Sequence, residues 1–361
     1  MRTVRGRGRC APVRVLAALA ALLIASPVAA GGEAGPISLR DQGFFWVGAH
    51  PRQVEVPGPD GKSAPGSVIQ GQMYVGFQLP AEKRHPYPLV LVHGGGGQAT
   101  DWMGTPDGRD GWLDYFLAAG FDVYFVDRPG LGRSPNTGGY RAAAAPPTTE
   151  LIATLFTARS RQYPGGGAAG TPELASHTAS SEPGMSASDA VLKADLAELL
   201  DRIGPAILVT HSNGGPSGWL AMEARPALVK GVLAIEPVGI SNDLAQLLTF
   251  SPVLASGEDL ASERRPPEGE GLDQCMLQPA ASVRTVPAFA GKPILFVGSP
   301  LSIFTPNIHC AAELFAQLGA DTKLARLTDY GIEGNGHFMN EELNNGEIAT
   351  RVFIPWLAAI R

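Results

Sequence analysis

The sequence AILVTHSNGG, residues 206–215, determines how the rest of the chain is interpreted. A short apolar run, typical of a buried parallel strand, ends abruptly at Ser212, and a helical pattern follows over residues 216–223. A serine on a sharp strand-to-helix turn has its hydroxyl held clear of the sheet, which is the geometry of a nucleophile elbow. Gly214 gives this turn the small residue that it needs, whereas Thr210 stands where glycine is usual. The match to G-x-S-x-G is therefore partial, and an ordinary strand-loop-helix turn is the alternative.

The first 30 residues predict a secretory signal peptide. Five arginines lie before or at the start of an apolar run at 15–24, and residues 28–30 (VAA) supply small side chains for cleavage. The alternative, a membrane anchor, needs about 20 apolar residues. This run is shorter and is followed by Pro27. We therefore expect a secreted or periplasmic protein with one catalytic domain at 31–361.

Composition and charge exclude several classes of function. The net charge of −6 is mild, and no basic stripe indicates nucleic-acid binding. No segment after the signal peptide is long and apolar enough to span a membrane, so we expect no membrane contact after cleavage. Histidines and cysteines show no metal-ligand spacing, so neither a metal nor a cofactor is expected. The sequence leaves open whether Cys275 and Cys310 pair, and whether the protein forms a homodimer.

Apolar runs alternate with helical patterns along the chain, which predicts an α/β fold with a mostly parallel sheet covered on both faces. Strands are expected at 44–47, 73–79, 89–92, 123–126, 207–209, 232–235, 294–297 and 323–327. Helices are expected at 111–119, 187–202, 216–224, 309–318 and 346–360.

Three other segments depart from this alternation. Residues 57–66 are rich in proline and glycine and predict a loop. Residues 141–186 and 242–287 are long and irregular, and such segments in a compact domain are usually functional or mobile. We interpret 141–186 as a cap insertion over a pocket. For 164–184 the alternative is a disordered surface insertion.

A glycine loop, His93 followed by GGGG at 94–97, comes directly after an early buried strand. Without Cβ atoms, its backbone N–H groups can closely approach a ligand oxygen. In hydrolases with a serine elbow, this loop and the residue after the nucleophile form the oxyanion hole. We therefore expect the N–H groups of Gly95 (alternatively Gly94 or Gly96) and Asn213 to be the donors. A phosphate loop is the competing interpretation, but no Gly-Lys-Ser/Thr follows. His93 itself is expected to be a structural hydrogen-bonding residue.

A nucleophilic serine needs a base, and the base needs an acid to orient it. In the chain order serine, acid, histidine, only His309 and His337 come late enough. His337 lies in the glycine-rich segment 331–339, between the last strand and the last helix, and is the expected base. His309 opens a predicted helix and is expected at a helix end or on the surface.

The acid is predicted by asking which of the predicted strands ends in a carboxylate residue. The loop at 298–301 (GSPL), where the acid is common, has no carboxylate. The preceding strand ends in Glu236, and a carboxylate at a buried strand end is costly unless it is paired. We therefore predict Glu236 as the acid, with Asp329 and Glu333 as alternatives.

These motifs resemble the α/β-hydrolase superfamily, and in particular a group of secreted bacterial esterases with a Ser-Glu-His triad. The matching segments are 93–94, 105–109, 111–112, 127 with 130–134, 210–212, 232–237 and 334–337. They cover about residues 44–357. In that group, the glutamate at the position of Glu236 is the triad acid. Some relatives carry paired cysteines after His-Gly, where this chain has Gly95 and Gly96.

The resemblance and the residues together predict a secreted serine hydrolase that cleaves small-molecule carboxylic esters through an acyl-enzyme. Ser212 is the nucleophile, His337 the base and Glu236 its orienting acid. Trp102, Met103 and Trp112 are predicted to line the substrate pocket, with plain packing as the alternative. A lactonase or amidase with the same triad, or a non-catalytic binding protein of the same fold, are the alternative functions.

Overall fold

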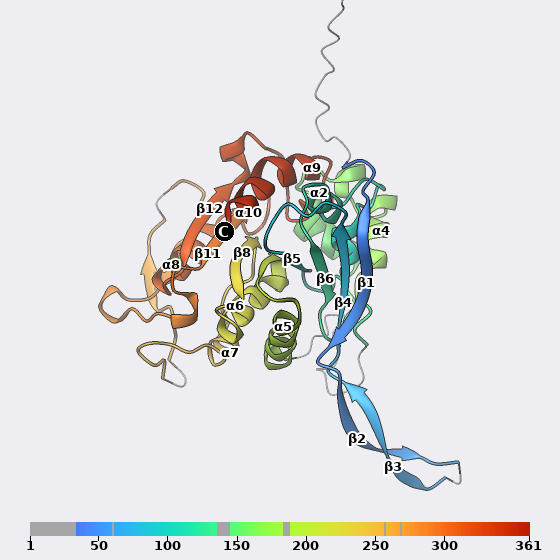
Figure 1. Ribbon diagram of the computed structural model, residues 1–361. Coiled ribbons are helices and arrows are strands. Elements are labelled where there is room, and N and C mark those ends of the chain that lie inside the picture. The colour runs from blue at the N-terminus through green and yellow to red at the C-terminus, as the bar shows by residue number, and fades with distance from the viewer. Residues whose placement is uncertain (1–33, 60, 136–144, 183–187, 256–257, 268) are drawn as a thin grey trace, which may run out of the picture.

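The computed structural model describes residues 34–361 except 60, 136–144, 183–187, 256–257 and 268. The predicted signal peptide and the ends of the predicted cap insertion lie outside these residues. An eight-stranded sheet forms the centre of the molecule, in the order β1-β4-β6-β5-β7-β8-β11-β12 (Figure 1). Its strands are β1 Leu39–Val47, β4 Met73–Pro80, β5 Leu89–Val92, β6 Val123–Asp127, β7 Ala206–His211, β8 Val229–Ile235, β11 Pro293–Gly298 and β12 Asp321–Arg326.

The pairing confirms the mostly parallel sheet that the sequence predicted. Strands β6, β5, β7, β8, β11 and β12 pair in parallel, whereas β4 is antiparallel to both β1 and β6. Every residue of β5 and β7 is buried, because helices cover both faces of the sheet. The carboxyl ends of parallel strands lie at the same edge of a sheet, so the loops that follow β5, β7 and β8 lie close together.

Two apolar clusters hold the helices against the sheet. One face packs against α5 Asp189–Ile203, α6 Gly215–Ala224 and α8 Ile308–Gln317. The other face packs against α2 Trp112–Ala118 and the C-terminal helical segment, made of α9 Asn345–Ile348, a π-helical turn Ala349–Phe353 and α10 Ile354–Ala359. Each of the five predicted helices is present, with its ends shifted by a few residues at most.

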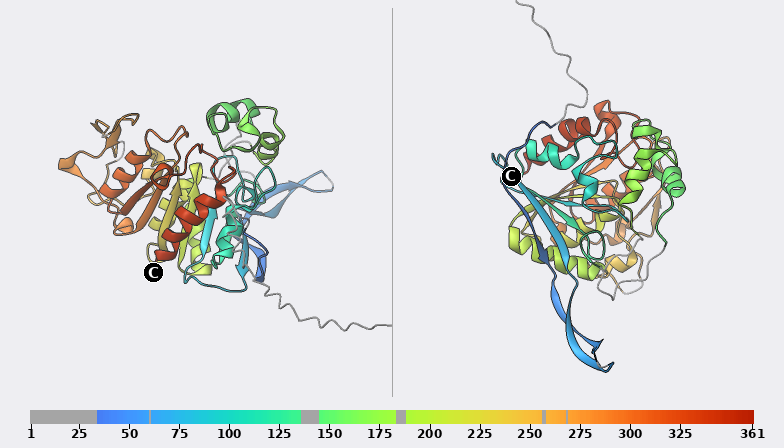
Figure 2. Two further views of the ribbon diagram at one scale, coloured as in Figure 1. Left: turned by 90° about the horizontal axis from the view of Figure 1, so that it is seen from above. Right: turned by 90° about the vertical axis from the view of Figure 1, so that its right-hand side faces the viewer.

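The segment predicted as a cap insertion contains helical turns and lies above one edge of the sheet (Figure 2). They are α3 Thr149–Ile152, a π-helical turn Ala153–Thr157, a 3₁₀ turn Pro164–Gly167 and α4 Pro172–Ala179. Thr171 caps α4, since its side chain accepts a hydrogen bond from the Leu174 N–H. These helical turns include two stretches of 164–184, the segment for which a disordered surface insertion was the alternative.

The prediction of a loop at 57–66 is wrong in part. Strands β2 His50–Pro57 and β3 Ser63–Gln70 form an antiparallel hairpin, and only its tip is a loop. This hairpin projects away from the body of the molecule (Figures 1 and 2). Most of its residues are exposed.

The described part of the irregular segment 242–287 contains α7 Asn242–Ala245, β9 Glu263–Arg265, β10 Cys275–Leu277 and a 3₁₀ turn, Ala280–Ser282. A disulfide joins Cys275 to Cys310 in the first turn of α8, with Cα atoms 5.1 Å apart. His309 is buried beside this disulfide at the start of the helix. Among the residues described here, no helix is long and apolar enough to cross a membrane.

Candidate active site

Ser212 lies on a sharp turn between β7 and α6. Its φ is +52°, a left-handed conformation that is rare for residues other than glycine and that clusters at functional sites. A 3₁₀ turn, Ser212–Gly214, connects the strand to the helix. A Cβ atom at Gly214 would lie 2.5 Å from the carbonyl oxygen of His93, so the close approach requires glycine. The turn has the strand-turn-helix form of a nucleophile elbow although Thr210 replaces the usual glycine.

His337 and Glu236, distant in sequence, meet beneath this turn. Nδ1 of His337 lies 2.6 Å from Oε2 of Glu236, and both side chains are almost completely buried. Glu236 directly follows β8 and has a φ of +42°, a second strained position. Ser212 and His337 line one cavity of about 190 Å³. The three residues predicted as nucleophile, base and acid therefore belong to one site.

Two serines of the loop after β11 surround the carboxylate. Oε1 of Glu236 accepts hydrogen bonds from the Ser299 N–H at 2.8 Å and the Ser299 hydroxyl at 2.7 Å. The Ser302 hydroxyl donates to Oε2 at 2.6 Å. The loop that carries the acid in the commoner arrangement thus supplies donors to an acid from the neighbouring strand.

Burial sets the protonation states of the pair. It lowers the pKa of His337 to about 3, so the ring is neutral at neutral pH and can accept a proton. Burial also raises the pKa of Glu236 to about 7, against the hydrogen bonds from Ser302 and Ser299 that favour the carboxylate. With Nδ1 donating to Glu236, the lone pair of His337 is on Nε2, the form that a general base needs.

The alternative acids do not occupy this position. Asp329 and Glu333 are both exposed. The Asp329 carboxylate instead accepts a hydrogen bond from the Arg326 N–H at the start of a 3₁₀ turn, Leu327–Tyr330. Their proximity to His337 in sequence does not bring their side chains into the buried pair.

The glycine loop after β5 packs directly against the serine turn. A Cβ atom on Gly95 would lie 2.2 Å from the side-chain nitrogen of Asn213. The carbonyl of Gly94 accepts a hydrogen bond from Nδ1 of His93 at 2.9 Å, and Nε2 of His93 accepts one from the Arg128 N–H. His93 is thus the structural hydrogen-bonding residue that was expected. Because the C=O and N–H of one peptide point in opposite directions, fixing the Gly94 carbonyl also fixes the direction of the Gly95 N–H.

A second buried glutamate, which the sequence did not single out, holds the loop of His337. Glu342 accepts hydrogen bonds from the Gly336 N–H at 2.6 Å, the Asn335 amide at 2.6 Å and the Ser160 hydroxyl. Burial raises its pKa to about 7. Ser160 belongs to the cap segment, so Glu342 joins the cap to the histidine loop.

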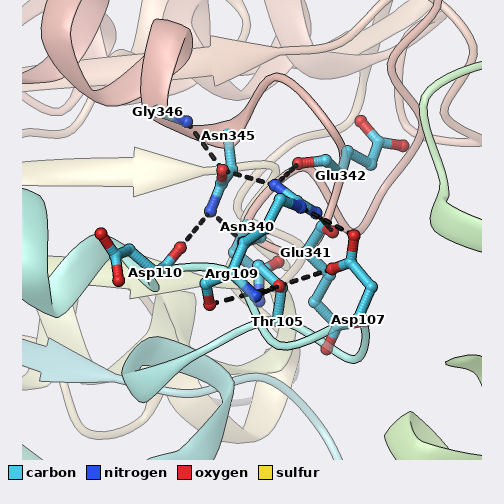
Figure 3. A network of polar contacts seen from close by, with 9 residues as sticks. All are labelled: Thr105, Asp107, Arg109, Asp110, Asn340, Glu341, Glu342, Asn345 and Gly346. Carbon is cyan, nitrogen blue, oxygen red and sulfur yellow. Dashed lines mark hydrogen bonds and ion pairs between the residues drawn. The ribbon is translucent and has the colours of Figure 1, made fainter. Parts of the chain in front are cut away.

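The 105–109 motif has a related role. Arg109 donates to the carbonyls of Glu342 at 3.0 Å and Glu341 at 2.8 Å, and to the side chain of Asn345 at 2.9 Å (Figure 3). Asp107 holds the same guanidinium through Nε at 2.7 Å. The motif therefore fixes the segment that follows the candidate base.

The cavity walls differ from those predicted. Trp102 and Trp112 are 1% and 0% exposed and pack against each other in the core, where an indole cannot contact a substrate. They do not line the cavity of Ser212. Met103 lines a second, more open cavity of about 300 Å³. The apolar wall beside Ser212 instead comes from Ile152, Phe156 and Phe338.

Polar residues close the other side of the Ser212 cavity. His177 of α4 lies 2.7 Å from Glu341 through Nδ1, and both residues line the Ser212 cavity and the second cavity. His211, beside the nucleophile, packs its ring against that of His337 with centroids 4.6 Å apart, and its Nε2 lies 3.0 Å from the His337 carbonyl. Sequence patterns carry no signal for these contacts, because they depend on which loops the fold brings together.

Comparison with known proteins shows the family of this chain. A family model described as the alpha/beta hydrolase fold matches residues 87–266. "Probable secreted lipase phiG" of Fungal sp. (strain ATCC 74256) is 35% identical over 316 residues, which cover 79% of this chain and 85% of that protein. The chain belongs to the α/β-hydrolase superfamily. The solved structure of a novel bacterial esterase resembles the fold of this α/β hydrolase, with a TM-score of 0.65 at 22% identity over 91% of this chain and 99% of the other.

Proposed function

We propose that this α/β hydrolase is an exported serine esterase that cleaves carboxylic esters through an acyl-enzyme intermediate. The observation that carries the proposal is the 2.6 Å contact between His337 Nδ1 and Glu236 Oε2 beneath the cavity that Ser212 lines. The similarity to a protein described as a secreted lipase supports ester hydrolysis as the reaction class.

The proposed reaction gives each of these groups one role. His337 takes the proton of the Ser212 hydroxyl through Nε2 while the serine oxygen attacks the ester carbonyl. Glu236 orients the imidazole and stabilises its charged form. The N–H groups of Gly95 and Asn213 bind the oxyanion, each worth roughly 3 kcal/mol in enzymes of this type. His337 then protonates the leaving alcohol, and water releases the acyl group by the same steps in reverse.

Replacement of the nucleophile tests the proposal. Ser212→Ala should abolish ester turnover and labelling by a fluorophosphonate probe while the melting temperature stays close to that of the wild type. Residual turnover above a few per cent of the wild-type rate would assign the nucleophile to another residue. A binding protein of the same fold is the second candidate, and it would leave the probe unreacted in the wild type as well.

The substrate class needs a separate experiment. A panel of p-nitrophenyl esters of increasing chain length, run beside lactones and anilides, would rank the three carbonyl classes by kcat/KM. We expect esters to be the best substrates, with short chains preferred because the cavity holds about 190 Å³. A higher kcat/KM for a lactone or an anilide would replace the esterase with a lactonase or an amidase using the same residues.

Export and assembly are two further parts of the proposal. The exported protein should begin near Gly31, and N-terminal sequencing of secreted material tests this directly. An intact Met1 in the exported protein would contradict it. A homodimer is the proposed assembly state, and sedimentation equilibrium tests it by giving the mass in solution.

A further inference from the structure

Arg128, directly after β6, is a buried arginine behind the glycine loop. Its side chain donates to two backbone carbonyls, that of Gly94 through Nη2 at 2.7 Å and that of Asn213 through Nη1 at 3.1 Å. In the part of the chain that the structure describes, its guanidinium forms no ion pair with a carboxylate. Burial lowers its pKa to about 10, so the group still carries its charge at neutral pH.

Burying such a charge is costly unless an anion pairs with it, and the two carboxylates that favour the charged form, Asp189 and Asp101, form no ion pair with it in the described structure. The residue is only 8% exposed, and its Nε has no hydrogen-bond partner among the described residues. A neutral side chain would avoid this cost. The cation therefore calls for an explanation beyond packing.

The two carbonyls belong to the two halves of the proposed oxyanion hole. Gly94 follows β5 and Asn213 follows β7, so Arg128 connects loops that are far apart in sequence. The Gly94 carbonyl is in the same peptide as the Gly95 N–H and points in the opposite direction. Holding that carbonyl on the Arg128 side leaves the Gly95 N–H directed away from the guanidinium.

The second proposed donor, the Asn213 N–H, is held by hydrogen bonds to the carbonyls on both sides of it. The carbonyl of Ser212, which shares its peptide with the Asn213 N–H, accepts a hydrogen bond from the Val238 N–H at 2.9 Å. Arg128 holds the carbonyl of Asn213 itself on the other side of that residue. Asn213 therefore has little freedom to turn its N–H away.

We propose that Arg128 is a positioning residue for the oxyanion hole: it holds the Gly94 and Asn213 carbonyls so that the Gly95 and Asn213 N–H groups stay directed at the developing oxyanion. Its buried charge also favours the negative charge that forms there. This role rests on the proposed ester hydrolysis at Ser212. A planar guanidinium suits it, because one fork can reach two carbonyls at once, which an ammonium cannot do with the same geometry.

Two replacements of Arg128 and one matched control test the proposal. Arg128→Met removes both contacts, and Arg128→Lys keeps the charge but not the fork. Arg133→Met is the control, because Arg133 is in the same turn, pairs with Asp127 at 2.7 Å and stacks over Tyr74, and does not contact the glycine loop in the described structure.

The measurements are kcat and KM for p-nitrophenyl butyrate, the melting temperature, and two inhibition constants. A pentyl trifluoromethyl ketone forms an oxyanion adduct with the nucleophile, whereas the matching methyl ketone reports ground-state binding. We expect Arg128→Met to lower kcat by about 10²-fold, as loss of an oxyanion donor does. The inhibition constant of the trifluoromethyl ketone should rise by a similar factor. KM and the methyl ketone constant should change by less than about threefold. Arg128→Lys should fall between this variant and the wild type.

A merely structural role predicts a different pattern. Arg133→Met should lower the melting temperature and leave kcat within about threefold, and the same pattern in Arg128→Met would overturn the positioning role. If Arg128→Met does not fold, the Arg128→Lys variant tests the positioning role instead. An unchanged kcat together with an unchanged inhibition constant of the trifluoromethyl ketone in that variant would also overturn the positioning role. A wild type that neither turns over the ester nor reacts with a fluorophosphonate would refute the proposed function and the positioning role together.

Discussion

Replacing Glu236, the proposed orienting acid, by glutamine should disable the proposed base His337 without disturbing the packing around the pair. The amide and the carboxylate have nearly the same shape, so the effect depends on whether the amide oxygen or the NH₂ group faces His337. Oε1 faces the Ser299 N–H, which can only donate a hydrogen bond. The glutamine oxygen must therefore take that position, and its NH₂ group must take the position of Oε2, facing His337 Nδ1 at 2.6 Å.

This orientation reverses the proton on the imidazole. An NH₂ group donates to Nδ1, so the ring proton moves to Nε2, and the nitrogen that should accept the Ser212 proton no longer has a lone pair. Replacing the triad acid by its amide in a serine protease lowers kcat about 10⁴-fold for this reason. We expect a similar loss here, which corresponds to about 5 kcal/mol of transition-state stabilisation.

Steady-state kinetics with p-nitrophenyl butyrate would measure this loss, and the melting temperature would confirm the fold. Asp329→Asn and Glu333→Gln are the controls and should stay within about threefold of the wild type, because both residues are exposed. In the wild type, kcat should fall as the pH drops through about 7, since protonation of the buried Glu236–His337 pair removes the base. A Glu236→Gln variant that keeps more than a tenth of the wild-type kcat would refute the assignment of the acid.

Three other predictions concern the glycine loop, a buried aspartate and the disulfide. Gly95→Ala should lower kcat at least tenfold, because the added methyl group displaces Asn213, whereas Gly239→Ala meets no atom within 4 Å and should stay within about twofold. Burial raises the pKa of Asp195 to about 8, above its value in the unfolded chain, so the native state binds the extra proton. The free energy of unfolding should fall as the pH rises toward 8. In urea titrations at pH 6 and 8.5, Asp195→Asn should reduce this slope, and the remaining slope comes from other buried carboxyls such as Glu236 and Glu342. Replacing both cysteines of the disulfide, which are 35 residues apart, with serine should lower the free energy of unfolding by about 3–4 kcal/mol in urea titrations, and an unchanged value would count against its contribution.

The sequence predicted the sheet because its strands are buried on both faces and read as continuous apolar runs. Leu89–Val92 and Ala206–His211 are examples, and neither has an exposed residue. The hairpin His50–Pro57 and Ser63–Gln70 gave no such signal, because most of its side chains face water and its tip is rich in proline and glycine.

Some residues of the candidate site could likewise be predicted from the sequence, and others could not. Glu236 could be predicted because a carboxylate at a buried strand end needs a partner. The contacts of Arg128 and Glu342 could not, because both residues bind backbone groups of loops that only the fold brings together. The large apolar side chains of Trp102 and Trp112 suit a pocket wall and a core equally well, and the structure places them in the core.

The projecting hairpin has a practical consequence for engineering this chain. A two-stranded ribbon without further packing is only marginally stable in water, so it can open without unfolding the central sheet. Its tip, between Pro57 and Ser63, is a site where a peptide tag or a small domain can be inserted with little effect on the rest of the molecule. A surface-attachment handle at that point would hold the enzyme by an arm directed away from its main body.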